Sequence, residues 1–119
     1  MAVITLGPYH QGELPPNLTV TFKDSSGNAI SLSGYTAEFA YRTYGGAWVT
    51  RIGGGQGATV DGDQVNNKGQ THYAWQAADF VTAGDFEGEF WVGNAGTQRF
   101  DSQRFAWQVK PAVVPAPTI

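Results

Sequence analysis

Three carboxylates, Asp85, Glu87 and Glu89, stand two residues apart in the last third of the chain. At this spacing they share one face of a β-strand, with about 7 Å between successive side chains. Such a set has the composition of an acid–base pair or a cation site. Because no histidine, nucleophile or amide-rich loop lies near it in sequence, we expect instead a solvated face, or one neutralised by arginines of a neighbouring strand or subunit.

The segment from Asp61 to Asn67 has the alternating carboxylate pattern of a calcium loop, but Val65 offers no side-chain oxygen at the third ligand position and no glutamate closes the loop at the twelfth. We therefore expect a polar turn. His10 and His72 are the only histidines and lie far apart in sequence. They could form a metal or acid–base pair only if the fold joined them, so we expect two unrelated side chains.

Nucleophilic and phosphate-binding chemistry also lacks a basis in the sequence. The chain has no cysteine, and none of its serines lies in a nucleophile elbow. The glycine-rich segment from Gly53 to Gly57 is followed by neither a lysine nor a helical pattern, so it is a flexible loop and not a phosphate cradle. The sequence thus predicts no catalytic residue, no metal and no cofactor, and hence not an enzyme.

The four tryptophans divide into two pairs. Trp75 and Trp107 are in phase with the apolar residues around them, which predicts that both are buried in the core. Trp91 is out of phase with its strand, and Trp48 follows a hairpin turn. These two could stack on sugars or be anchors buried against another subunit, or Trp91 could be covered by Arg99. We favour the interface.

The elements that carry these residues are strands. A long, twisted β-hairpin from Asp79 to Val109 has apolar side chains at every second position, and the rest of the chain must cover its aromatic face. After Phe100 the apolar phase slips by one residue, which predicts a β-bulge near Asp101 and Ser102.

The turn of this hairpin is predicted at Asn94 to Gly96, with Gly96 in the left-handed position. That turn would set Phe90 opposite Phe100 and Trp91 opposite Arg99.

Further strands are expected at Val3–Leu6, Leu18–Phe22, Tyr35–Arg42, Trp48–Ile52 and Gln70–Trp75. Seven to nine short antiparallel strands separated by turn residues are typical of an all-β sandwich. We assign residues 1–109 to this domain, with 1–16 as an irregular N-terminal arm and edge strand. Residues 110–119 form an extended, proline-rich C-terminal tail. Both terminal segments are expected to contact other subunits.

The amino-acid composition also supports an all-β fold. The 119 residues include 16 glycines, with 13% aromatic and only 14% charged residues, which favours short strands and turns over helices. The net charge of −3 argues against nucleic acid and anionic membranes as partners. Neither a secretion signal nor a stretch of transmembrane length is visible, so we expect synthesis in the cytoplasm without a signal peptide.

Two stretches resemble known families. The approach from Asp79 to Phe86 is similar to the corner before the sixth strand of immunoglobulin-like domains, with Phe86 in place of the usual tyrosine and Gly88 in place of the antibody cysteine. More specifically, the segments 18–39, 73–79 and 83–90 resemble the immunoglobulin-like N-terminal domains of phage upper baseplate proteins and related small tailed-phage virion proteins.

This resemblance implies an immunoglobulin-like β-sandwich acting as a non-enzymatic structural component of a tailed bacteriophage virion, in the tail or baseplate. Its partners would be other virion proteins and copies of itself. Capsid decoration is one alternative, and a carbohydrate-binding module that holds a surface glycan through Trp48, Trp91 and Tyr44 is another. The predicted interface residues are Trp48, Trp91, Arg99, Pro111, Val113, Val114, Pro115 and Ile119.

Overall fold

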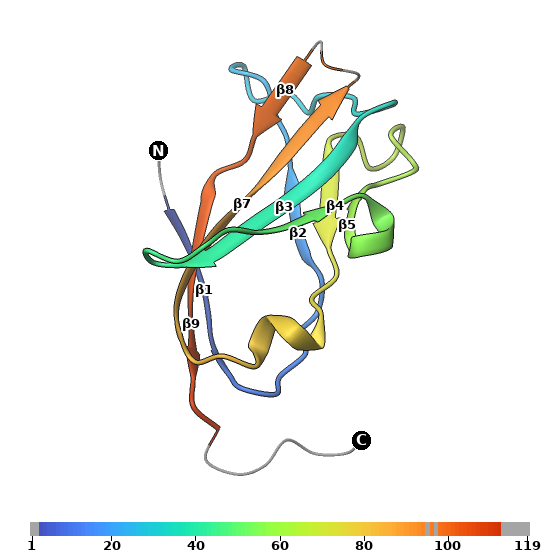
Figure 1. Cartoon of the computed structure of the whole chain (residues 1–119). Coiled ribbons are helices and arrows are strands. Elements are labelled where there is room, and N and C mark those ends of the chain that lie inside the picture. Colours follow the sequence, from blue (N-terminus) through green and yellow to red (C-terminus); the bar gives the residue numbers. More distant parts are fainter. Residues whose placement is uncertain (1–2, 95, 97, 113–119) are drawn as a thin grey trace.

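The computed structural model describes residues 3–94, 96 and 98–112, and in this part of the chain nine strands form two packed sheets (Figure 1). Sheet A has six strands in the order β1-β9-β7-β3-β4, with β8 paired to β7, and sheet B has the order β2-β6-β5. The all-β sandwich is confirmed. The strands are β1 (Val3–His10), β2 (Leu18–Thr21), β3 (Thr36–Thr43), β4 (Val49–Ile52), β5 (Ala58–Val60), β6 (Gln70–Tyr73), β7 (Gly84–Asn94), β8 (Gln98–Asp101) and β9 (Arg104–Lys110), with single 3₁₀ turns at η1 (Gly54–Gln56) and η2 (Ala77–Phe80).

Alternating side chains build an aromatic core between the sheets. Phe39 of β3 is fully buried, and its ring centroid lies 4.4 Å from that of Tyr73 in sheet B and 4.9 Å from that of Phe90 in β7. Trp75 and Trp107 are both buried, as their phase predicts, with ring centroids 5.4 Å apart. The core thus consists largely of interlocking rings contributed by both sheets.

Gly88 has a packing role in this core. A Cβ built at Gly88 would lie 2.9 Å from the Ala40 carbonyl oxygen and 3.0 Å from Trp107 Cη2. The position that resembles a cysteine site in antibody domains therefore has to stay without a side chain, because the Trp107 ring occupies the space.

The hairpin register differs from the predicted one. The ladder pairs Val92 with Phe100 and Trp91 with Asp101, so the predicted pairs of Phe90 with Phe100 and Trp91 with Arg99 are wrong. The loop begins one residue later than expected because Asn94 still pairs with Gln98, whose N–H it also receives on Oδ1 at 2.8 Å.

Gly96 has the expected positive φ of 80°, while Ala95 and Thr97 lie outside the described residues. The predicted bulge is confirmed, since β7 pairs Trp91 with Asp101 but Gly88 with Phe105, which leaves one extra residue on the second strand. Ser102 closes this bulge: its N–H donates to the Phe90 carbonyl and its Oγ accepts the Phe90 N–H, both at 2.9 Å.

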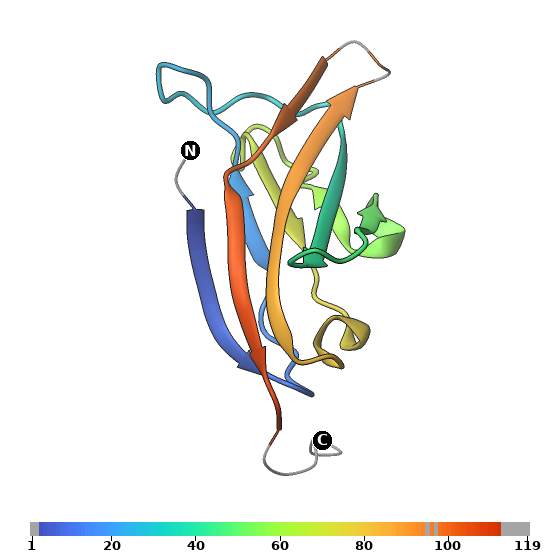
Figure 2. The ribbon, with the colours of Figure 1, turned by 60° about the vertical axis from the view of Figure 1, so that its left-hand side comes forward.

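The N-terminal strand is the main topological correction. β1 runs parallel to β9, from Val3 opposite Arg104 to His10 opposite Lys110, so the sandwich is not wholly antiparallel (Figure 2). The strand does not end at Leu6, because the chain passes Gly7 with a register shift and resumes pairing at Tyr9. The Tyr9 ring packs at 5.2 Å from Phe80 and anchors this second half. Residues 3–10 are therefore an edge strand, as predicted in part, and the irregular segment is confined to residues 11–16.

The beginning of the C-terminal tail is held by the segment that follows β1. The Gln11 N–H donates to the Lys110 carbonyl at 2.9 Å, and the Gln11 side chain accepts the Ala112 N–H at 3.2 Å. The rest of the tail, residues 113–119, lies outside the described part of the chain. Whether it contacts other subunits stays a prediction.

Candidate binding surface on sheet A

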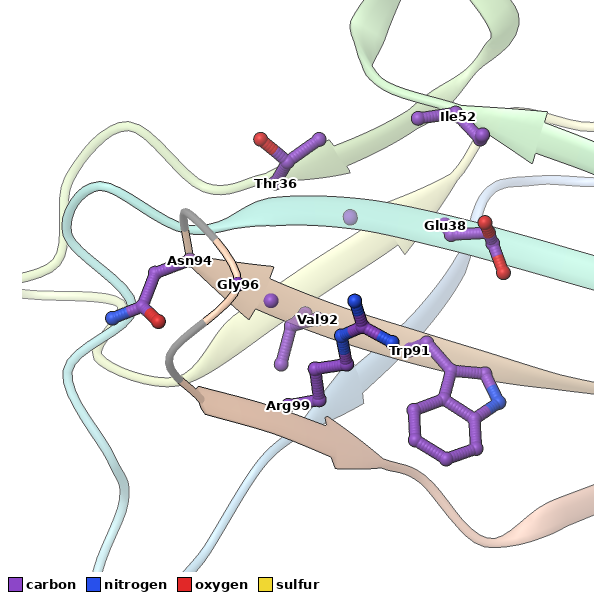
Figure 3. A pocket seen from close by; sticks show the side chains of 10 residues that line it. Thr36, Glu38, Ile52, Trp91, Val92, Asn94, Gly96 and Arg99 are labelled. Carbon is purple, nitrogen blue, oxygen red and sulfur yellow. The ribbon is translucent and has the colours of Figure 1, made fainter.

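A shallow hollow of about 570 Å³ lies on the outer face of sheet A, over the ends of β3, β4, β7 and β8 (Figure 3). Its side chains come from four strands, and they include Thr36, Glu38, Ile52, Trp91 and Arg99. Sheet pairing creates this cluster, since Glu38 lies opposite both Ile52 and Trp91 in the ladders. Residues at positions 38, 52 and 91 thereby form one row across three strands.

Gly93 forms the floor of the hollow. It pairs with Thr36 on one side and with Arg99 on the other, and a Cβ at this position would meet Arg99 Cγ at 3.4 Å. Because Gly93 has no side chain, the backbone of β7 is accessible between the two flanking side chains. A larger residue in this register would fill the hollow.

Trp91 is the largest apolar group at this site and remains 37% exposed. Its Nε1 donates to Glu89 Oε1 at 3.3 Å. Arg99 extends toward Trp91 (Figure 3), and the ring still keeps 37% of its surface exposed, so any cover by Arg99 is partial.

Charged groups surround the ring on several sides. The carboxylate residues Glu38 and Asp101 are the cross-strand partners of Trp91, and the guanidinium of Arg99 lines the same hollow. The surface thus combines a stacking plane, hydrogen-bond acceptors and a strong donor. This set suits recognition of a partly polar surface and includes no activated nucleophile.

One carboxylate in the row below this hollow, Glu87, is neutralised. Glu87 is only 4% exposed and lies between Arg42 Nε at 3.0 Å and Arg104 Nη1 at 3.1 Å. The two arginines come from β3 and β9, the strands on either side of β7. The sequence analysis expected either a solvated face or one neutralised by arginines of a neighbouring strand. The second expectation is confirmed for Glu87.

The other predicted aromatic residues lie elsewhere. The Arg42 guanidinium carbon lies 4.4 Å from the centroid of the Trp48 ring, which is a cation–π contact that leaves Trp48 46% exposed. Tyr44 lines a second, smaller hollow of about 280 Å³ together with Pro8 and Asp85. The structure therefore does not bring Trp48, Trp91 and Tyr44 into one site.

Of the predicted tail contacts, Pro111 is exposed. The remaining ones lie outside the described residues: Val113, Val114, Pro115 and Ile119.

The polar segments considered as metal sites have local partners. The carboxylate of Asp63 accepts the backbone N–H and the side-chain amide of Asn66 at 3.1 and 2.9 Å, and these bonds hold the pKa of Asp63 below its usual value. His10 lies in sheet A beside Glu13, whereas His72 lies in sheet B. Within the described ranges, no group of three or more histidine and carboxylate side chains could hold a metal ion.

Asp79 is a buried acid that sequence reasoning missed. It is 3% exposed and accepts hydrogen bonds from Tyr41 Oη at 2.5 Å, Tyr73 Oη at 2.6 Å and the backbone N–H of Gln76 at 2.8 Å, with Arg51 Nη2 at 3.2 Å. Burial, followed by the hydrogen bond to Asp79, raises the pKa of both tyrosines. This cluster ties β3, β4 and β6 to η2 and is structural, since it is enclosed by the core. The sequence did contain a signal for such an acid: Tyr41 and Tyr73 are at core-facing positions, and a buried tyrosine hydroxyl requires a hydrogen-bond acceptor.

No helix within the described residues is both long and apolar enough to span a bilayer. Comparison with protein-family models and with curated proteins finds no match to this chain.

Proposed function

We propose that this protein is a non-enzymatic structural component of a tailed bacteriophage virion, in the tail or baseplate, that assembles through the outer face of sheet A. The observation that carries the proposal is the exposed Trp91 in a hollow formed by four strands. The resemblance of segments 18–39, 73–79 and 83–90 to phage virion domains supports the setting. Capsid decoration would use the same surface and is the alternative location.

The hollow has the composition of a protein interface. Trp91 forms the apolar centre, with Glu38 and Asp101 on either side of it in the ladders. Arg99 lines the same hollow, while Ile52, which is 53% exposed, lies beyond Glu38 on the edge strand β4. Interfaces concentrate their binding energy on such a central aromatic residue, while the polar rim excludes water and sets the register. A neighbouring subunit with a complementary apolar side chain would therefore gain most of its affinity at Trp91.

A carbohydrate-binding module is the second candidate. It is favoured by the same hollow, because an aromatic plane beside a carboxylate and a guanidinium can stack on a sugar ring and bond its hydroxyl groups. Trp48 and Tyr44 cannot contribute to that site, since they line other parts of the surface. A glycan site on this chain would therefore depend on Trp91 alone.

The test compares particles assembled with Trp91→Ala or Trp48→Ala chains and measures the copy number of the chain by quantitative mass spectrometry. We expect Trp91→Ala to reduce incorporation by about tenfold or more and Trp48→Ala to leave it nearly unchanged. Equal incorporation of the wild type and Trp91→Ala, with both variants folded, would reject this docking surface. Absence of the chain from purified particles would reject the virion role itself.

A glycan array on the isolated protein tests the second candidate, the carbohydrate-binding module, separately from particle assembly. Saturable binding to a glycan that Trp91→Ala abolishes and Trp48→Ala retains would establish the carbohydrate site. If no glycan binds in this way, a protein partner remains the proposed occupant of the hollow.

A further inference from the structure

β1 forms one margin of sheet A. It pairs with β9 on one side, and in the described part of the chain no strand pairs with its other side (Figure 2). With eight residues, it is twice as long as the opposite edge strand β4, which has four. A strand in this position presents a row of backbone N–H and C=O groups that can pair with another strand.

The first half of β1 lacks the features that normally prevent such pairing. Residues Val3 to Leu6 include no charged side chain, and Val3 and Ile4 are 54% and 37% exposed. Edge strands are usually protected by lysine, proline or inward-pointing charges. Here Pro8, which has no N–H, protects only the second half. Gly7, with a φ of 70°, interrupts the regular edge, so the segment open to pairing runs from Val3 to Leu6.

The inward-facing side of this segment is also incompletely covered. Ile4 and Leu6 are in register with Phe105 and Trp107, whose side chains are buried in the core. Ile4 nevertheless keeps more than a third of its surface exposed, because the three strands of sheet B cover less of the sandwich than the six of sheet A. β1 therefore overhangs the core with an aliphatic face.

We propose that β1 pairs with β1 of a second copy of this chain, antiparallel and about a two-fold axis beside Thr5, so that the two A sheets become continuous. A two-fold axis perpendicular to the sheet keeps the inner faces of both copies on the same side. Residues that lie opposite each other must therefore point their side chains to the same face of the sheet. Centring on Thr5 satisfies this condition. It sets Ile4 opposite Leu6 of the second copy on either side of the axis, and the regular pairing ends there because Gly7 has a φ of 70° at the register shift of β1.

Self-complementarity favours a second copy over an unrelated strand. The pairing brings together only uncharged side chains, and each overhanging Ile4 gains the Leu6 of the other copy as a neighbour on the inner face. Each chain has a formal charge of −3, so two copies repel least along a neutral edge. The contact is isologous and closes with two copies.

The absence of cysteine from the chain makes the geometry directly testable. At the proposed axis the two Thr5 Cα atoms would be about 4.5–5.5 Å apart, which lies within the range that a disulfide spans. Thr5→Cys should therefore cross-link two copies under mild oxidation. Thr50→Cys is the matched control, because Thr50 is also an exposed threonine on an edge strand of sheet A, but on the opposite edge.

The equilibrium test is sedimentation or light scattering over a concentration series. Thr5→Lys sets two like charges opposite each other and should raise the dimer dissociation constant by about tenfold or more, whereas Thr50→Lys should leave it unchanged. A monomer at all concentrations, a dimer that tolerates Thr5→Lys, or cross-linking of Thr5→Cys no faster than that of Thr50→Cys would each overturn the proposal. Trp91 lies outside this contact, so Trp91→Ala should still dimerise, and the outcome does not depend on the proposed function.

Discussion

Replacing Asp79 by asparagine should lower the free energy of unfolding by about 4 kcal/mol. The substitution keeps the shape of the side chain but removes the charge that faces Arg51, and it leaves one oxygen where Tyr41 and Tyr73 now have two. Breaking a buried ion pair costs about 3–5 kcal/mol, and an unsatisfied buried hydroxyl costs about 1–3 kcal/mol. Relaxation of the 22% exposed Arg51 side chain toward water offsets part of this sum.

Urea unfolding followed by tryptophan fluorescence measures the loss. With a slope of about 1.3 kcal/mol per molar for a domain of this size, the midpoint should fall by about 3 M. Tyr41→Phe and Tyr73→Phe should each cost about 1–1.5 kcal/mol, because each removes one hydrogen bond and leaves the carboxylate with other donors. Asp85→Asn, the same change at an exposed position, is the matched control and should leave the midpoint unchanged.

The result that would refute this reasoning is a loss below about 1 kcal/mol for Asp79→Asn. In that case the side-chain donors Tyr41, Tyr73 and Arg51 would find water or other partners, and the cluster would not hold the two sheets together.

Three further outcomes follow from the structure. Because the folded-state pKa values of Tyr41 and Tyr73 are raised, the unfolded chain loses these protons first; stability is retained below about pH 10, falls above it, and should fall less steeply in the Tyr→Phe variants. Gly88→Ala should cost about 2–3 kcal/mol in urea unfolding, because its Cβ would overlap the Ala40 carbonyl and Trp107. Glu87→Gln should cost only about 1–2 kcal/mol by the same measurement, since both of its arginine partners reach solvent; a loss as large as that of Asp79→Asn would contradict this difference.

Local patterns were sufficient to predict the strands and much of the core. Alternation of period two correctly predicted Trp75 and Trp107 as buried and Trp91 as exposed, because each side chain's face depends only on its phase within its own strand. The bulge at Ser102 was predictable for the same reason, since a slip in the apolar phase is visible in the chain itself.

Pairings between distant segments were not predictable in this way. Nothing in Val3 to His10 shows that it lies parallel to a strand one hundred residues later, because parallel pairing is decided by the whole topology. The predicted hairpin register was wrong by two residues because it ended the ladder before Asn94. In the structure Asn94 adds one more pair, with Gln98, and this moves the loop by one residue. The Asp79 cluster joins four elements, β3, β4, β6 and η2, and only the packed fold brings its donors together.

The parallel arrangement of β1 and β9 has a mechanical consequence. Val3 is in register with Arg104 and His10 with Lys110, so the start of β1 and the end of β9 lie at opposite ends of one ladder. Traction applied at these two ends would load all the rungs at once in shear, instead of opening them one after another as in a hairpin pulled apart at its base. Forced unfolding depends on the unfolding rate and not on equilibrium stability, so this geometry would slow rupture of the domain even where its thermodynamic stability is ordinary.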